Sequence, residues 1–98
     1  MNPELEKVKK EIEAQRSVLE NEYSISKIGV FGSVAKGNAT NKSDIDFLVE
    51  FKSPIGLFEF SGLKLFLEDV FKRKVDLATP RALKSLTRDE ILRSVVYL

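Results

Sequence analysis

The chain has 98 residues, with 16 Lys or Arg against 15 Asp or Glu, so its formal net charge is +1. This length predicts a single domain, residues 1–98, with a modest hydrophobic core. The near-neutral charge gives no basic field for nucleic acid, and the absence of Cys and His excludes disulfides and the usual zinc ligands. Any metal would be bound by oxygen atoms, which favours Mg²⁺ or Mn²⁺.

Membrane and export signals are missing from the sequence. No apolar run approaches the ~20 residues that a membrane-spanning helix needs. The first residues, MNPELEKVKKEIEAQ, lack the apolar core of a signal peptide. The sequence therefore predicts a cytoplasmic protein.

The first predicted element is a helix that begins at Pro3 and ends near Glu20. Asn2 can cap its N-terminus, and proline suits the first helical position because that position needs no N–H donor. An apolar stripe at helical spacing predicts that one side packs against the core, and it consists of Leu5, Val8, Ile12 and Leu19.

Two strands are predicted next. Residues 25–31, ISKIGVF, are rich in β-branched and aromatic side chains, and the turn at 32–33 ends this strand. A turn of helix over 34–38 and a polar loop over 38–42 lead to the second strand, residues 44–51. Side chains of a strand alternate between two faces, so Ile45, Phe47, Val49 and Phe51 share one face and Asp44, Asp46, Leu48 and Glu50 share the other.

A second long helix is predicted over residues 57–72, and a third strand over residues 75–78, VDLA. Residues 72–74, Lys-Arg-Lys, lie at the end of that helix, where positive charge suits the helix dipole. The strand turns Asp76 away from its packing face. The wide apolar face of the helix consists of Phe60, Leu63, Phe66, Leu67, Val70 and Phe71.

The tail is predicted to be helical. Thr79-Pro80 is typical of an N-cap followed by a first helical position, and residues 87–90, TRDE, fit the capping-box pattern. We therefore expect a short helical turn and then a helix from about Arg88 to the end, with an inner face of Ile91, Leu92 and Val95. The order helix, strand, helical turn, strand, helix, strand, helix predicts an α/β or α+β domain, with a small mixed sheet flanked by helices.

Asp44, Asp46 and Asp76 are candidate metal ligands. Residues i and i+2 of a strand lie on one face roughly 6.5–7 Å apart, and their side chains can converge on two metal ions about 3.5–4 Å apart. The first two acids alone are weak evidence, because an exposed strand face often carries two solvated acids. If the third strand pairs beside the second, three carboxylates gather on one face; otherwise Asp76 is an ordinary acid at a strand end.

Gly32 and Ser33 are candidate phosphate-binding residues. Glycine lets the backbone approach a ligand closely, and N–H groups at a turn that enters a helix bind anions. The Ser33 hydroxyl can donate one more hydrogen bond. Lys36 and Lys42 flank this turn and could neutralise phosphate charge. The alternative is a plain strand-to-helix turn between surface lysines, and the Walker spacing is absent.

Taken together, these residues resemble a known family. Gly32-Ser33, ten residues, Asp44-Ile45-Asp46 and a third acid at Asp76 are similar to the nucleotidyltransferase superfamily that includes DNA polymerase β. The small size, the strand SDIDFLVEF and the closing ILRSVVYL resemble the minimal nucleotidyltransferases (MNT), commonly the antitoxins of MNT–HEPN toxin–antitoxin pairs. Lys36 stands where such proteins often have arginine, which keeps the charge but loses the bidentate fork.

The resemblance implies a polymerase β-like nucleotidyltransferase fold with ATP as substrate and two Mg²⁺ ions, or Mn²⁺. It implies that Asp44 and Asp46 ligate both ions, that Asp76 ligates the catalytic ion and helps deprotonate the acceptor, and that Gly32 and Ser33 hold the triphosphate. The enzyme would transfer AMP to the hydroxyl group of a tyrosine in a HEPN toxin, and this modification would neutralise the toxin.

Two alternatives stay open. One is an antitoxin that blocks its toxin by occupancy alone, and the other is a transferase for a small molecule or RNA, although the near-neutral charge argues weakly against RNA. A chain of this length leaves no room for an acceptor domain, so the acceptor would bind the open sheet face or arrive on another protein. The tail residues Val96, Tyr97 and Leu98 could be interface or core.

Overall fold

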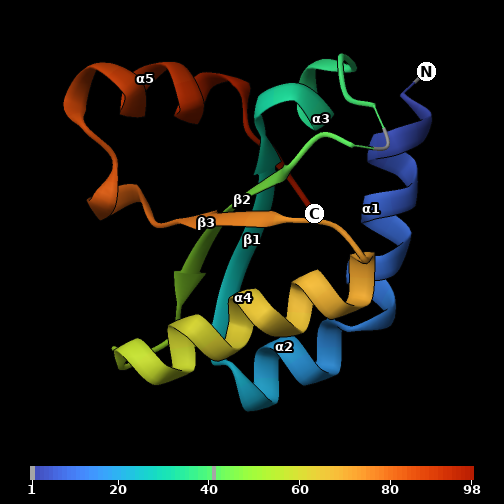
Figure 1. Cartoon of the computed structure of the whole chain (residues 1–98). Coiled ribbons are helices and arrows are strands. Elements are labelled where there is room, and N and C mark those ends of the chain that lie inside the picture. Colours follow the sequence, from blue (N-terminus) through green and yellow to red (C-terminus); the bar gives the residue numbers. More distant parts are fainter. Residues whose placement is uncertain (1, 41) are drawn as a thin grey trace.

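The computed structural model describes residues 2–40 and 42–98. A four-stranded mixed sheet in the order β3-β2-β1-β4 forms its centre, with helices packed around it (Figure 1). The predicted class, a small mixed sheet flanked by helices, is therefore confirmed. None of the helices within these residues is long and apolar enough to cross a membrane. In chain order the elements are α1 (Pro3–Ala14), α2 (Arg16–Glu22), β1 (Ile25–Phe31), α3 (Gly32–Lys36), β2 (Ile45–Phe51), α4 (Leu57–Phe71), β3 (Val75–Ala78), the 3₁₀ turn η1 (Pro80–Ala82), α5 (Ser85–Ser94) and β4 (Val96–Tyr97).

The predicted N-terminal helix is divided in two. Asn2 caps α1 as expected, because its Oδ1 accepts a hydrogen bond of 3.2 Å from the Leu5 N–H. The helix is interrupted at Gln15, whose backbone angles of −102° and 6° are not helical, and α2 continues in a new direction. The bend brings Leu19 of α2 into the core that Val8 and Ile12 of α1 already occupy. One straight helix was therefore the wrong prediction, although its apolar stripe was right.

The core lies between one face of the sheet and the helices α1, α2 and α4. Figure 1 shows these three helices gathered to one side, with α5 apart from them. Burying each large aliphatic side chain contributes about 1.5–3 kcal/mol, so this layer holds the sheet in place. Its fully or almost fully buried members include Val8, Ile12, Leu19, Ile28, Val30, Ile45, Phe47, Val49, Leu63, Leu67 and Val75.

The strands that carry acidic residues are adjacent. β2 pairs with β1 in antiparallel fashion and with β3 in parallel fashion, and the register sets Asp46 opposite Asp76. β2 begins at Ile45, one residue later than predicted, and the Ile45 N–H donates to the Lys74 carbonyl at 3.1 Å. Helix α4 connects β2 to β3, and Lys72, the residue that caps its C-terminus, has a left-handed conformation (φ 55°).

The tail differs most from the prediction. α5 begins at Ser85, so Thr87 lies inside the helix and the predicted capping box is wrong. The helix stops at Ser94, and Val96–Tyr97 form β4 along β1. A strand here satisfies backbone groups at the edge of β1, and the Leu98 N–H donates to the Ile28 carbonyl at 2.9 Å.

The predicted inner face of the last helix is not buried. Leu92 is 40% exposed, and no residue of α5 is buried. Tyr97 is also largely exposed, whereas Leu98 packs against the core. Thr79 precedes the predicted helical turn, which forms as η1, but its side chain makes no capping hydrogen bond.

Candidate active site

The Gly32-Ser33 turn forms without any loop, because β1 passes directly into α3. Gly32 has a φ of +72°, a left-handed conformation that favours glycine. A Cβ atom at this position would collide with the Asp46 carboxylate. The candidate phosphate-binding turn and the candidate metal ligand are therefore in direct contact, and only a residue without a side chain fits between them.

Two further acidic residues lie near Asp46. It lies opposite Asp76 in the parallel register of β2 and β3, and Asp44 directly precedes β2. Partial burial raises the pKa of Asp46 to about 6, with further contributions from the charge of Asp76, from hydrogen bonding to its carboxyl group and from the charge of Asp44. The expectation that β3 pairs beside β2 is confirmed, and the pairing sets Asp76 next to Asp46.

The kind of ligand present suits a hard divalent cation. All three groups offer carboxylate oxygens, and the sequence contains no His or Cys to compete with them. Asp46 and Asp76 repel each other when both are ionised, and a cation between them would remove that cost. In their present rotamers, no three acidic side chains among residues 2–40 and 42–98 form a closed metal-binding group. The residues fit such an ion in chemistry and in backbone placement, with Asp46 and Asp76 as the adjoining pair.

The two candidate lysines lie on the rim of this region. Lys36 is the last residue of α3 and Lys42 belongs to the loop before β2, and both are exposed. Neither forms an ion pair with another residue in the described part of the chain. Asn41, in the predicted polar loop, lies outside the described residues. The structure thus brings Gly32, Asp46 and Asp76 into contact, with Ser33 next in the chain to Gly32 and Asp44 just before β2, and leaves both lysines exposed.

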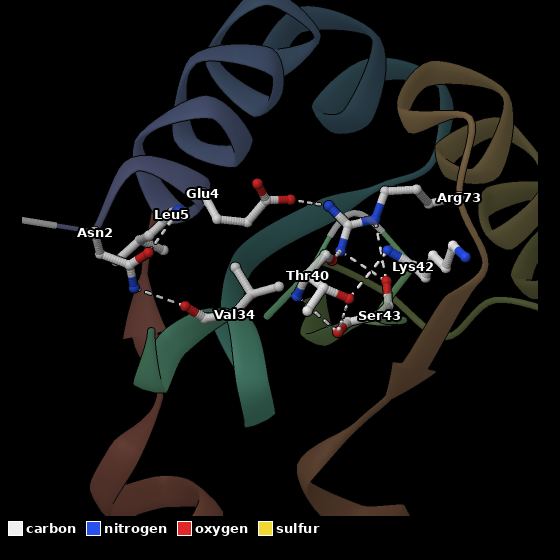
Figure 2. Close-up of polar contacts among 8 residues, drawn as sticks. All are labelled: Asn2, Glu4, Leu5, Val34, Thr40, Lys42, Ser43 and Arg73. Carbon is white, nitrogen blue, oxygen red and sulfur yellow. Dashed lines mark hydrogen bonds and ion pairs between the residues drawn. The ribbon is translucent and has the colours of Figure 1, made fainter. Parts of the chain in front are cut away.

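A second polar cluster lies beside the site, and no sequence pattern indicates it. The Arg73 guanidinium pairs with Glu4 of α1 and donates to the carbonyls of Thr40 and Ser43, just before Asp44 (Figure 2). In the sequence Arg73 reads only as a charge at the end of α4. Its partners are 30 to 69 residues away, so no local pattern could have revealed them.

Asn2, the residue that caps α1, also contacts α3, the short helix that begins at Gly32. The Asn2 side-chain amide donates to the Val34 carbonyl of α3 at 2.7 Å, while its oxygen caps α1 (Figure 2). The first turn of α1 therefore contacts α3 and, through Glu4, the segment that precedes Asp44.

Comparisons with known proteins identify the family of this chain. The model of the nucleotidyltransferase domain matches residues 5–98. Protein adenylyltransferase MntA of Thermococcus cleftensis is 36% identical over 94 residues, which cover 96% of this chain and 95% of that protein. A solved structure assigned as a minimal nucleotidyltransferase is 35% identical, with a TM-score of 0.82 over 100% of this chain and 97% of the other.

More distant structures share the fold. A chain from the MntA–HepT toxin–antitoxin complex is 18% identical, with a TM-score of 0.61 over 99% of this chain and 70% of the other. The family model covers all the candidate site residues, which are Gly32, Ser33, Asp44, Asp46 and Asp76. Of these, Asp46 and Asp76 are opposite each other in the sheet. The chain therefore belongs to the nucleotidyltransferase domain family, as one of its minimal members, and is an enzyme of that class.

Proposed function

We propose that this enzyme transfers AMP from ATP to a hydroxyl group of a partner protein. The observation that carries the proposal is the pairing of Asp46 with Asp76 directly beside Gly32, because it joins a carboxylate cluster to a turn suited to phosphate. A protein acceptor is supported by the relative from Thermococcus cleftensis, which is named a protein adenylyltransferase.

Asp44, Asp46 and Asp76 would hold two divalent ions, Mg²⁺ or Mn²⁺, with the first two acids shared between both. Bound there, such ions neutralise the charge on the triphosphate and on the leaving pyrophosphate. The raised pKa of Asp46 agrees with this role, since burial and the neighbouring charges of Asp76 and Asp44 both disfavour its ionised form and a bound cation would favour it.

The protein's own groups position the reactants. Backbone N–H groups of Gly32 and Ser33, with the Ser33 hydroxyl, hold the triphosphate, and Lys36 and Lys42 screen its charge. Asp76, the most exposed of the three acids, accepts the proton of the incoming hydroxyl, because the chain has no histidine. The acceptor oxygen bonds to the α-phosphorus as the bond to the pyrophosphate oxygen breaks in line.

The proposed acceptor is a tyrosine on a HEPN-type toxin, which the modification neutralises. The resemblance to MNT antitoxins supports this partner, and solved structures of the same fold include MntA–HepT complexes. The open carboxylate face is accessible to a side chain that another protein presents, since Asp76 lies exposed on β3.

Incubation with α-labelled ATP, Mg²⁺ and the purified toxin encoded beside the gene tests the proposal. We expect label on a toxin tyrosine and a loss of at least ~100-fold in labelling rate for the D44N/D46N variant. If that variant neutralises the toxin as well as the wild type does, the protein acts by occupancy. Absence of label on protein, RNA and small molecules, despite bound nucleotide, would contradict AMP transfer.

A further inference from the structure

The backbone on both sides of Asp44 is hydrogen-bonded to two consecutive residues, Arg73 and Lys74. The carbonyl of Ser43 accepts hydrogen bonds from Arg73 Nε at 3.0 Å and Nη2 at 2.7 Å, and the Ile45 N–H donates to the Lys74 carbonyl at 3.1 Å. The chain then continues from Lys74 through β3 to Asp76. The backbone of one candidate ligand is thus fixed directly to the segment that leads to another.

Arg73 has a geometry that a lysine cannot reproduce. Besides its two bonds to Ser43, Nη2 donates to the Thr40 carbonyl at 3.1 Å, and Nη1 pairs with the Glu4 carboxylate. A planar guanidinium can serve all these acceptors at once, whereas an ammonium group is a single point charge. The arrangement holds the end of the loop against β3 and α1 (Figure 2).

The Arg73–Glu4 pair is the most buried ion pair in the described part of the chain. The two side chains are 15% and 19% exposed, whereas Arg16 and Glu13, the next pair, are 29% and 67% exposed. Exposed pairs contribute little because water screens them, but removal of one partner from a mostly buried pair leaves the other charge poorly solvated. Glu4 therefore fixes the guanidinium in one orientation.

Val75, which follows Arg73 and Lys74, is also held by a hydrogen bond. The Val75 N–H, at the start of β3, donates to Glu68 Oε2 of α4 at 3.0 Å. Arg73 thus lies between helix α4 and the edge strand β3, which is fixed to α4 at Val75, so we expect a change in the Arg73 side chain to act on the loop before Asp44.

We propose that Arg73, oriented by Glu4, is a positioning residue that sets Asp44 relative to Asp76 for binding of the divalent ion and nucleotide. The inference rests on the proposed function, because it assigns these acids to the bound ion. Arg73 touches no reacting atom and acts through the backbone of Ser43.

Mn²⁺ binding in the presence of a non-hydrolysable ATP analogue, followed by electron paramagnetic resonance, tests the proposal without reliance on turnover. We expect R73M to weaken Mn²⁺ binding about tenfold, since loss of groups that orient metal ligands costs 10–100-fold. R73K should recover only part of the affinity, and E4Q should lose less than R73M.

Two controls separate positioning from general instability. R16M removes the exposed Arg16–Glu13 pair, and I25A weakens the core at the end of β1 remote from Asp46; both should bind Mn²⁺ as the wild type does. Urea unfolding identifies variants of equal stability for comparison. If I25A and R73M are equally destabilised and lose Mn²⁺ affinity equally, Arg73 is merely structural and the proposal is overturned.

A second comparison asks whether Arg73 acts through Asp44. In a D44N background, R73M should cause little further loss of Mn²⁺ affinity, because the ligand that it positions is already gone. Additive losses would overturn the inference. Failure of the wild type to bind Mn²⁺ would overturn both the inference and the proposed function, whereas Mn²⁺ binding without transfer to any acceptor would count only against the latter.

Discussion

At the residue scale, the feature that organises the site is the Asp46 carboxylate. Gly32, Asp76 and Asp44 all act on it, the first by leaving space and the other two by their charge. The sequence identifies all four residues because their chemistry is local: a small turn, an alternating strand and an acid between apolar neighbours. It misses Arg73 because an arginine at a helix end has the same sequence pattern whether or not it reaches back to another loop.

The raised pKa of Asp46 predicts a stability that depends on pH. With a folded-state pKa near 6 against an ordinary value of 3.8, the folded protein binds this proton more tightly than the unfolded chain. The contribution of Asp46 to stability therefore falls as pH rises from about 4 to 6, and stays low above that range. D46N removes the charge and should melt about 4 °C higher than wild type at pH 7.5.

Thermal unfolding of both proteins at several pH values provides the measurement. Near pH 4 the difference should shrink, because the wild-type carboxyl is then protonated in the folded state. A variant that is equally stable or less stable than wild type at pH 7.5 would show that burial of the Asp46 charge beside Asp76 and Asp44 is not a significant cost.

At the element scale, the strands follow from the sequence better than the tail does. β2 and β3 have alternating patterns of their own, and both form within one residue of the prediction. β4 has only two residues, Val96 and Tyr97, and its conformation depends on the free edge of β1 about seventy positions earlier. The capping pattern at Thr87 contains no information about that edge, so the sequence predicts a helix for the whole tail.

Gly29 offers a direct test of how the tail docks. A Cβ atom there would lie 2.7 Å from Val95 Cγ2 and 3.1 Å from Tyr97 Cδ1, so the absence of a side chain lets the tail cross β1. G29A should lower the free energy of unfolding by about 1–3 kcal/mol through overpacking, and amide exchange at Leu98, which bonds to Ile28, should accelerate.

G62A provides the matched control. Its added Cβ would lie 3.9 Å from Tyr23 Cε1, an ordinary contact, within helix α4. We expect it to be neutral or to stabilise the protein by about 0.5–1 kcal/mol, because alanine favours a helix interior. Equal effects of the two substitutions would contradict a specific role for Gly29.

At the scale of the whole molecule, α1, α2 and α4 cover one face of the sheet, and Asp76 stays exposed on β3. The acidic cluster raises the energy of the folded protein until a cation binds, so ligands and stability should be linked. At a concentration 100 times its dissociation constant, a ligand that binds only the folded state adds about 2.7 kcal/mol.

Mg²⁺ together with a non-hydrolysable ATP analogue should therefore raise the melting temperature of wild type, and EDTA should reverse the shift. The D44N/D46N variant should show little shift, since it lacks two of the three acids. An equal shift for that variant would mean that the nucleotide binds elsewhere or without these carboxylates.

The contact between Glu4 and Arg73 joins residues 69 positions apart, and the Asn2 amide reaches 32 positions to Val34. We expect contacts of such long range to form late in folding, because closing a long loop costs entropy before the contact can stabilise the chain. A partly folded chain can thus hold all three aspartates, and even pair β2 with β3, without an ordered site. We therefore expect the site to become ordered only when α1 docks against α3 and the segment before Asp44.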